Sequence, residues 1–223
     1  MLNKRQAIVD TAMRLFYANG YHAVGIDRII AEAGVAKMTM YKYFTSKTDL
    51  IVAVLKARDA DFQGSLWAFV DTFHEPLEKL KAIFIWHDRW LNEPAFNGCM
   101  FINAAVEYSD PGDLIHHTSR LHKQALQDHI TAVLEGVVKK KPAQRLGGQL
   151  LQVLEGAIVT ALVFKDRSAA LTAWRTAAAI LKAEGLDGVK NFRGSRPMAR
   201  PARASAAHTA AGKKPSDSSL PSG

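Results

Sequence analysis

Residues 25–47 read GIDRIIAEAGVAKMTMYKYFTSK, and this stretch decides the fold. In its first half, apolar residues recur three and four positions apart, as on one face of a helix: Ile26, Ile29, Ile30 and Ala33. Gly34 interrupts the pattern and predicts a tight turn. A second short helix follows over residues 36–44. Two short helices joined by a glycine turn predict a helix-turn-helix over about residues 25–44.

The outer face of the second short helix carries cations, a hydroxyl and phenols. These side chains are Lys37, Thr39, Tyr41, Lys42 and Tyr43. Such groups suit phosphates and base edges, and a helix this short can enter a major groove end-on. The alternative is that Tyr41 and Tyr43 are core aromatics, as we expect for Phe44, and that the lysines form a solvated face. For the two tyrosines both interpretations stay open.

Two further helices flank the helix-turn-helix. From Lys4 to Asn19 apolar residues recur at helical spacing, and Gly20 follows as a C-terminal stop. Ser46 is placed to cap a fourth helix that starts at Lys47.

A longer set of residues places this segment in a known pattern. The set comprises Gly20-Tyr21, Ile29, Ala33-Gly34-Val35, Thr39 to Phe44, Ser46-Lys47 and Leu50. Over about residues 4–55 it resembles, without a gap, the N-terminal signature of the TetR family of transcriptional regulators. The resemblance implies an all-α protein with an N-terminal three-helix DNA-binding unit and a larger helical domain for ligand binding and dimerisation.

The resemblance also implies roles for individual residues. Thr39, Tyr41 and Tyr43 hold positions that face DNA, and Lys47 holds one where phosphate contact is usual, in agreement with the attraction of a helix N-terminus for anions. We expect Lys37 and Met38 to carry sequence choice. The full expected DNA-binding set is Gly25, Arg28, Lys37, Met38, Thr39, Tyr41, Lys42, Tyr43 and Lys47.

Three residues depart from the family pattern. Gly25 stands where a Thr or Ser usually caps the second helix and touches phosphate. It lacks the hydroxyl for that contact, and Arg28 is the residue placed to replace it. Ala36 replaces the usual Ser at the start of the recognition helix. Ile30 replaces a small residue and requires wider packing between helices.

Charge is divided unevenly along the chain. The 223 residues carry a formal net charge of +8, to which residues 1–58 contribute +5, residues 59–185 −2 and residues 186–223 +5. The basic ends are therefore the parts suited to a polyanion. With 48% apolar and 22% charged residues, the chain has the composition of a soluble protein with a substantial core.

We expect three parts in the chain. Residues 1–58 form the DNA-binding domain, and residues 59–185 form a helical ligand-binding and dimerisation domain. Residues 186–223 are rich in Arg, Pro, Ala and Ser and nearly lack large apolar residues. This composition predicts a basic, disordered tail.

Residues 76–93 form a helix that is apolar on two sides. One face carries Leu77, Leu80, Phe84, His87 and Leu91, and another carries Ile83, Trp86 and Trp90. Such a helix is either a central core helix or one that lines a cavity with its second face. Both interpretations stay open.

The segment 98–108 is apolar except for Asn103 and Glu107. A buried amide needs a hydrogen-bond partner, so Asn103 is a candidate to bind a ligand. The sequence GCMF at residues 98–101, followed by Glu107, resembles a subgroup of the TetR family with a Gly-Cys-x-Phe start to the C-terminal domain. The expected effector site consists of Trp86, Trp90, Phe101, Asn103 and Glu107.

Two helices near the end, over residues 143–165 and 168–183, are rich in Leu, Val and Ala. One wide apolar face carries Leu150, Val153, Leu154, Ala157, Ala161 and Phe164. The resemblance implies that this pair, about residues 143–183, meets its copy in a homodimer, as two DNA half-sites require. The alternative is that the pair only closes the core of its own domain.

The sequence gives little support for a metal site, an enzyme or a disulfide. Adjacent His116 and His117 point to different helix faces and no histidine pair has metal-ligand spacing, so we expect no metal. Nucleophile-elbow and phosphate-loop motifs are absent from the sequence, which predicts neither an enzyme nor a bound cofactor. The one cysteine, Cys99, cannot form an intrachain disulfide and is expected to be a small buried hydrophobe.

The N-terminal residues show no apolar signal-peptide core, and no stretch reaches about 18 uninterrupted apolar residues. We therefore expect a cytoplasmic protein with no membrane partner. The sequence predicts a sequence-specific transcriptional regulator, expected to be a repressor released from double-stranded operator DNA by an unknown small-molecule effector. Two alternatives are a helical small-molecule-binding protein or enzyme that retains the N-terminal hairpin, and a non-specific nucleic-acid binder that acts through the basic tail.

Overall fold

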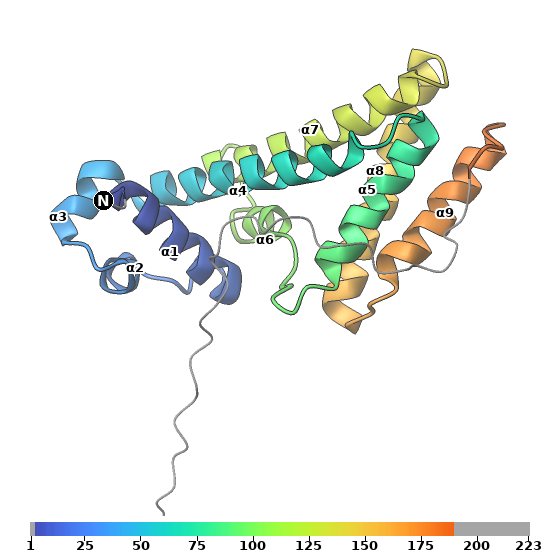
Figure 1. Ribbon diagram of the computed structural model, residues 1–223. Helices are drawn as coiled ribbons and strands as arrows, with labels where there is room; N and C mark the ends of the chain where they lie inside the picture. Colours follow the sequence, from blue (N-terminus) through green and yellow to red (C-terminus); the bar gives the residue numbers. More distant parts are fainter. Residues whose placement is uncertain (1–2, 190–223) are drawn as a thin grey trace, which may run out of the picture.

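The chain is helical throughout the part that the structure describes. The computed structural model describes residues 3–189, and these residues form nine helices and no strand (Figure 1). The helices are α1 Lys4–Asn19, α2 Ile26–Ala33, α3 Lys37–Tyr43, α4 Lys47–Val70, α5 Pro76–Leu91, α6 Met100–Glu107, α7 Leu114–Glu135, α8 Lys140–Phe164 and α9 Ala169–Ala183. The expected all-α fold class is confirmed.

Helices α1 to α3 pack together at one end of the molecule (Figure 1). Gly34 ends α2 in the left-handed conformation, with φ 64° and ψ 35°, which only glycine adopts without steric cost. The chain therefore turns sharply into α3. Met40 and Phe44 point inward and are 0% and 3% exposed. The helix-turn-helix geometry predicted from the sequence is present.

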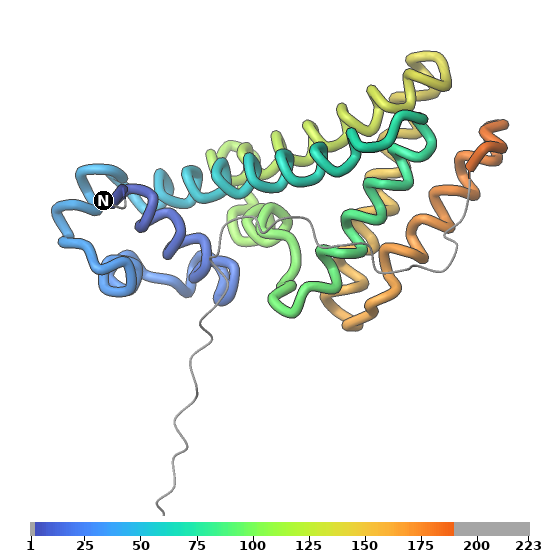
Figure 2. The backbone as a smooth tube through the Cα atoms, in the orientation of Figure 1, coloured from blue at the N-terminus to red at the C-terminus, as the bar shows by residue number. Residues whose placement is uncertain are grey.

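Helix α4 connects this small bundle to the rest of the molecule. Its first turn is capped as predicted, because the Ser46 hydroxyl accepts a hydrogen bond from the Asp49 amide at 3.0 Å. The helix then runs to Val70 without a break, so residue 58, the expected domain boundary, lies inside it. Figure 2 follows the chain along α4 into the larger helical part.

Helix α8 is the centre of the larger part, since it packs against both α7 and α9. Leu146, Leu150, Leu154 and Ile158 repeat every four residues on its buried side. By length and composition α8 is the one described helix that would suit a membrane span, although the sequence led us to expect none. Because its apolar side packs against neighbouring helices, we assign it to the core of the helical domain.

The first residues of the expected tail belong to the folded part. Leu186 packs against the core, and Val189 is 5% exposed. Residues 190–223, the remainder of the segment expected to be disordered, lie outside the described residues.

Candidate functional site

Helix α3 presents an exposed face formed by most of the expected DNA-binding residues. Met38 is 82% exposed, Tyr41 44% and Tyr43 39%. Lys37 and Lys42 are exposed as well, and Thr39 is half-buried. The two tyrosines are therefore exposed. This excludes the interpretation as core aromatics, which the sequence had left open.

Two cations near α3 are held by carboxylates of α2. The Lys37 ammonium lies 3.3 Å from Asp27, and the Arg28 guanidinium lies 3.0 Å from Glu32. Both pairs are exposed to solvent, where an ion pair contributes little stability and exchanges readily for another anion. The pairs orient the side chains without preventing contact with phosphate.

Gly25 and Lys47 lie at the N-terminal ends of the helices before and after α3 in the chain. Gly25 is the N-cap of α2, with φ −81° and no side-chain hydrogen bond to the helix. Lys47 is half-buried, and its ammonium donates to the carbonyl of His22 at 3.4 Å. Partial desolvation lowers the pKa of Lys47, and the carboxylate of Glu107 opposes that shift.

Glu107, at the end of α6, contacts the turn between α1 and α2. Its two carboxylate oxygens accept from the amide of Tyr21 at 2.9 and 3.0 Å, and one also accepts from the amide of His22 at 2.6 Å. The turn permits this approach because Gly20 has φ 82°, and a Cβ there would lie 2.9 Å from the carboxylate. We call this set of bonds the Glu107 contact.

Two other contacts fasten the same turn region to the larger domain. The buried hydroxyl of Tyr21 donates to the carbonyl of Met100 at 2.9 Å. The amide of Asn97 donates to the hydroxyl of Tyr17 at 2.7 Å. Both partners lie at or just before the start of α6, so both ends of this short helix touch the N-terminal bundle.

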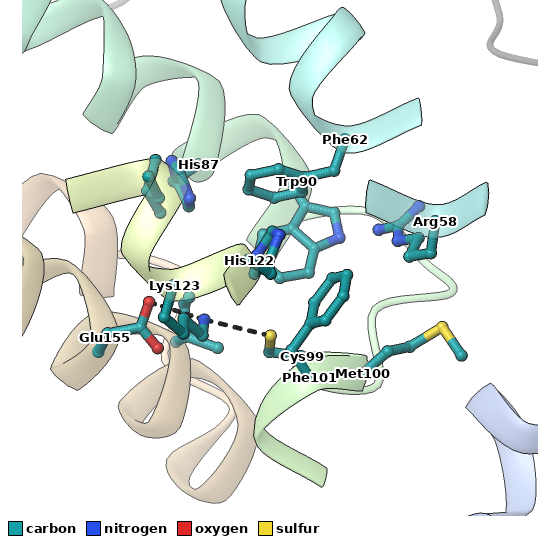
Figure 3. A pocket seen from close by; sticks show the side chains of 12 residues that line it. Arg58, Phe62, His87, Trp90, Cys99, Met100, Phe101, His122, Lys123 and Glu155 are labelled. Carbon is teal, nitrogen blue, oxygen red and sulfur yellow. Dashed lines mark hydrogen bonds and ion pairs between the residues drawn. The ribbon is translucent and has the colours of Figure 1, made fainter. Parts of the chain in front are cut away.

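A small cavity lies where α4, α5, α6, α7 and α8 converge (Figure 3). It measures about 10 Å³, close to the space of one water molecule. Its lining is Arg58, Phe62, His87, Trp90, Cys99, Met100, Phe101, His122, Lys123, Leu126, Glu155 and Ile158. The lining is aromatic and aliphatic, with a few polar groups.

The structure brings only part of the expected effector site together. Trp90 and Phe101 line the cavity. Trp86 is not part of the lining and packs edge-on against Phe62 at a centroid distance of 4.8 Å. Asn103 is half-buried in α6 outside the lining, and Glu107 faces the N-terminal bundle instead.

The polar groups of the cavity are mostly paired. The Lys123 ammonium lies 2.8 Å from Glu155 and 3.4 Å from the Cys99 sulfur. The Nδ1 of His122 lies 2.6 Å from Asp59. Burial, helped by the charge of Lys123, lowers the pKa of His122 to about 4, so the ring is neutral at pH 7 and donates to the carboxylate.

His87 is one of the polar lining side chains that the sequence did not assign to the site. It is 0% exposed, and its burial lowers the ring pKa to about 3. Its position on an apolar face of residues 76–93 was the available signal, but such a histidine is as often a satisfied core residue. Phe62, His122 and Glu155 gave no signal, since they come from helices far apart in sequence.

The comparisons with known proteins agree with the geometry. Residues 8–54 match the model of the bacterial regulatory proteins of the tetR family. The structure of SCO4454, a TetR-family transcriptional regulator from Streptomyces coelicolor, is 31% identical with a TM-score of 0.76, and the match covers 81% of this chain and 95% of that one. The chain belongs to the TetR family. It is a DNA-binding transcriptional regulator whose helix-turn-helix lies in the N-terminal bundle.

Other TetR-type proteins are similar over most of their length. The HTH-type transcriptional regulator YxaF of Bacillus subtilis is 23% identical over 172 residues, which cover 74% of this chain and 88% of YxaF. A TetR transcriptional regulator from Chloroflexus aurantiacus has a TM-score of 0.70 at 20% identity, covering 80% of this chain and 94% of its own, and shows the fold alone. The matches therefore extend beyond the N-terminal bundle into the larger helical part.

Proposed function

We propose that this protein is a cytoplasmic repressor that binds operator DNA as a homodimer and leaves it when a small molecule occupies the cavity. In this proposal residues 1–58 bind DNA, and residues 59–185 bind the effector and the second subunit. The observation that carries the proposal is the position of α6, whose first residues line the cavity and whose two ends both contact the DNA-binding bundle.

The exposed face of α3 supports groove binding. Tyr41 and Tyr43 offer hydroxyls and Lys42 offers a cation, all of which reach solvent. Such groups position a helix against phosphates and base edges. Met38 is exposed at the start of α3, where its side chain suits contact with a thymine methyl group.

The outer sides of α8 and α9 support dimerisation. On α8 the exposed stripe includes Gly156, Val159 and Val163, and on α9 it includes Thr172, Arg175, Thr176 and Ala179. Val159 and Val163 are 47% and 64% exposed, although both side chains are apolar. Small and β-branched residues let two helix pairs approach closely, so these stripes suit a two-fold interface.

Coupling through α6 follows from the size of the cavity. About 10 Å³ holds no organic molecule, so an effector has to displace lining residues. Cys99, Met100 and Phe101 are lining residues at the start of α6, and Glu107 at its end holds the α1–α2 turn. An effector that favours a displaced α6 shifts the population away from the arrangement that fits the operator.

Selection of bound fragments from genomic DNA, followed by gel shift on the selected fragment, tests this function. We expect salt-sensitive, sequence-selective binding, and we expect Tyr41→Ala to weaken it about 10- to 100-fold. Leu121→Ala, at a side chain 49% exposed on α7, is the matched control and should bind as the parent protein does. Equal affinity for selected and unrelated fragments would overturn the proposal.

A further inference from the structure

His87 carries a buried hydrogen-bond acceptor that no protein group uses among the described residues. Its Nδ1 lies 2.8 Å from the carbonyl of Ile83, and a carbonyl only accepts, so Nδ1 holds the proton. In a neutral ring the other nitrogen, Nε2, is then an acceptor. Nε2 is fully buried and has no hydrogen-bond partner.

The surroundings of His87 suit a flat, apolar molecule. Its ring meets Phe62 and Trp90 edge-on, at centroid distances of 5.7 and 5.9 Å. Across the cavity Phe101 stacks on His122 with centroids 3.6 Å apart and planes 8° apart. These rings come from α4, α5, α6 and α7 and lie together around the cavity (Figure 3). Aromatic faces and edges at these angles complement another planar ring.

The charges around the cavity favour an uncharged ligand. The ammonium of Lys123 is neutralised by Glu155 at 2.8 Å, and Asp59 is held by the neutral ring of His122 at 2.6 Å. A carboxylate placed between these groups would have to replace Glu155 or lie against it. Burying a second anion beside Glu155 carries a desolvation cost that an uncharged ligand avoids.

We propose that the effector is an uncharged planar aromatic molecule bearing a hydroxyl group, whose O–H donates to Nε2 of His87. This rests on the proposed function only in taking the cavity as the effector site. A hydroxyl satisfies the buried acceptor, and the ring fills the space between Phe62, Trp90 and Phe101. Met100 lines the same space, and its flexible thioether can move aside to make room.

Four naphthalene probes of similar size test this assignment on the full chain. 2-Naphthol carries the hydroxyl, naphthalene and 2-methoxynaphthalene lack the donor, and 2-naphthoate is an anion. Binding is measured by isothermal titration calorimetry and by quenching of tryptophan fluorescence, since Trp90 lines the cavity. We expect 2-naphthol to bind about tenfold more tightly than any other probe, because an unmet buried acceptor weakens the others.

Substitutions at His87 assign the preference to its nitrogen. His87→Leu removes the acceptor and should abolish the preference for 2-naphthol, whereas His87→Gln keeps an acceptor and should retain it. His129→Leu, at an exposed histidine of α7, is the matched control and should retain it too. If the melting curve shows that His87→Leu does not fold, the assignment is tested by the probe series on the parent protein and on His87→Gln.

Equal binding of 2-naphthol and naphthalene, tighter binding of 2-naphthoate, or a preference that survives His87→Leu would each overturn the assignment. Release of DNA is measured separately, on the selected fragment. A preference for 2-naphthol without any release of DNA keeps the ligand class and contradicts effector control, so the two proposals fail in different ways.

Discussion

Ala36, the N-cap of the recognition helix α3, has no side-chain oxygen to accept from the first-turn amides. Because Ser at an N-cap satisfies one of these donors, Ala36→Ser should raise the free energy of unfolding by about 1 kcal/mol. Urea denaturation of the parent and the variant measures the difference. Ala36→Val adds bulk at the same exposed site without an acceptor and should not stabilise. Equal stability of the Ser and Val variants would contradict the assignment of Ala36 as a deficient cap.

His87 and His122 predict a pH dependence of stability. Burial lowers the pKa of His87 to about 3 and that of His122 to about 4, whereas histidines in the unfolded chain titrate near pH 6.5. Below about pH 6.5 the unfolded chain therefore binds protons that the folded chain does not, and the free energy of unfolding falls with pH. The slope reaches about 1.4 kcal/mol per pH unit for each histidine.

Urea denaturation at pH 7, 6 and 5 checks this slope. His87→Gln should lose less stability than the parent protein over that range, because of the two histidines only His122 then takes up a proton on unfolding. His74→Gln, at an exposed histidine, should keep the parent slope. A His87→Gln slope equal to that of the parent would show that His87 is not buried in its neutral form.

At the scale of single residues, the sequence predicted which side chains are exposed but not which distant residues they contact. Local spacing predicted that Lys37 and Lys42 lie on the outer face of α3, whereas the DNA-facing roles of Tyr41 and Tyr43 were implied by the resemblance to the TetR family. Glu107 was assigned to the effector, yet its partner amides are 85 and 86 residues away. Nothing local distinguishes a carboxylate that caps a distant turn from one that faces a ligand.

Helix α6 is the element that joins the two functions. Glu107→Gln keeps one carbonyl oxygen but removes the charge that strengthens three bonds to backbone amides. We expect it to lower the free energy of unfolding by about 1 kcal/mol and to weaken the release of DNA by an effector. Melting curves and gel shifts with and without 2-naphthol measure the two effects.

Glu135→Gln removes an exposed charge at the end of α7 and should change neither property. If Glu107→Gln released DNA as fully as the parent protein does, coupling would not pass through the Glu107 contact.

Element boundaries followed from capping and turn residues. Gly20, Gly34, Ser46 and Pro76 each lie at a predicted helix end. The length of α4 was not predicted. The boundary at residue 58 was inferred from the charge composition and not from a helix-breaking residue. A change of composition marks a change of surface and need not interrupt a helix.

At the scale of the whole molecule, the stripe on α8 and α9 predicts a dimer. Val159→Asp with Val163→Asp places two charges on the exposed part of α8 and should yield monomers by analytical ultracentrifugation. Because each half-site then binds alone, operator affinity should fall at least about tenfold. Val137→Asp, 37% exposed beyond α7, is the control and should remain dimeric. A dimeric double variant would place the interface elsewhere.

The central claim is that α3 of two subunits reads two half-sites of an operator. Hydroxyl-radical footprinting of the full chain on the selected fragment tests it most directly, alongside a chain that ends at Val189. Both chains should give the same two-fold symmetric protection, centred on major grooves about one helical turn or a small multiple of it apart. Protection without symmetry, or protection lost when residues 190–223 are removed, would contradict the claim.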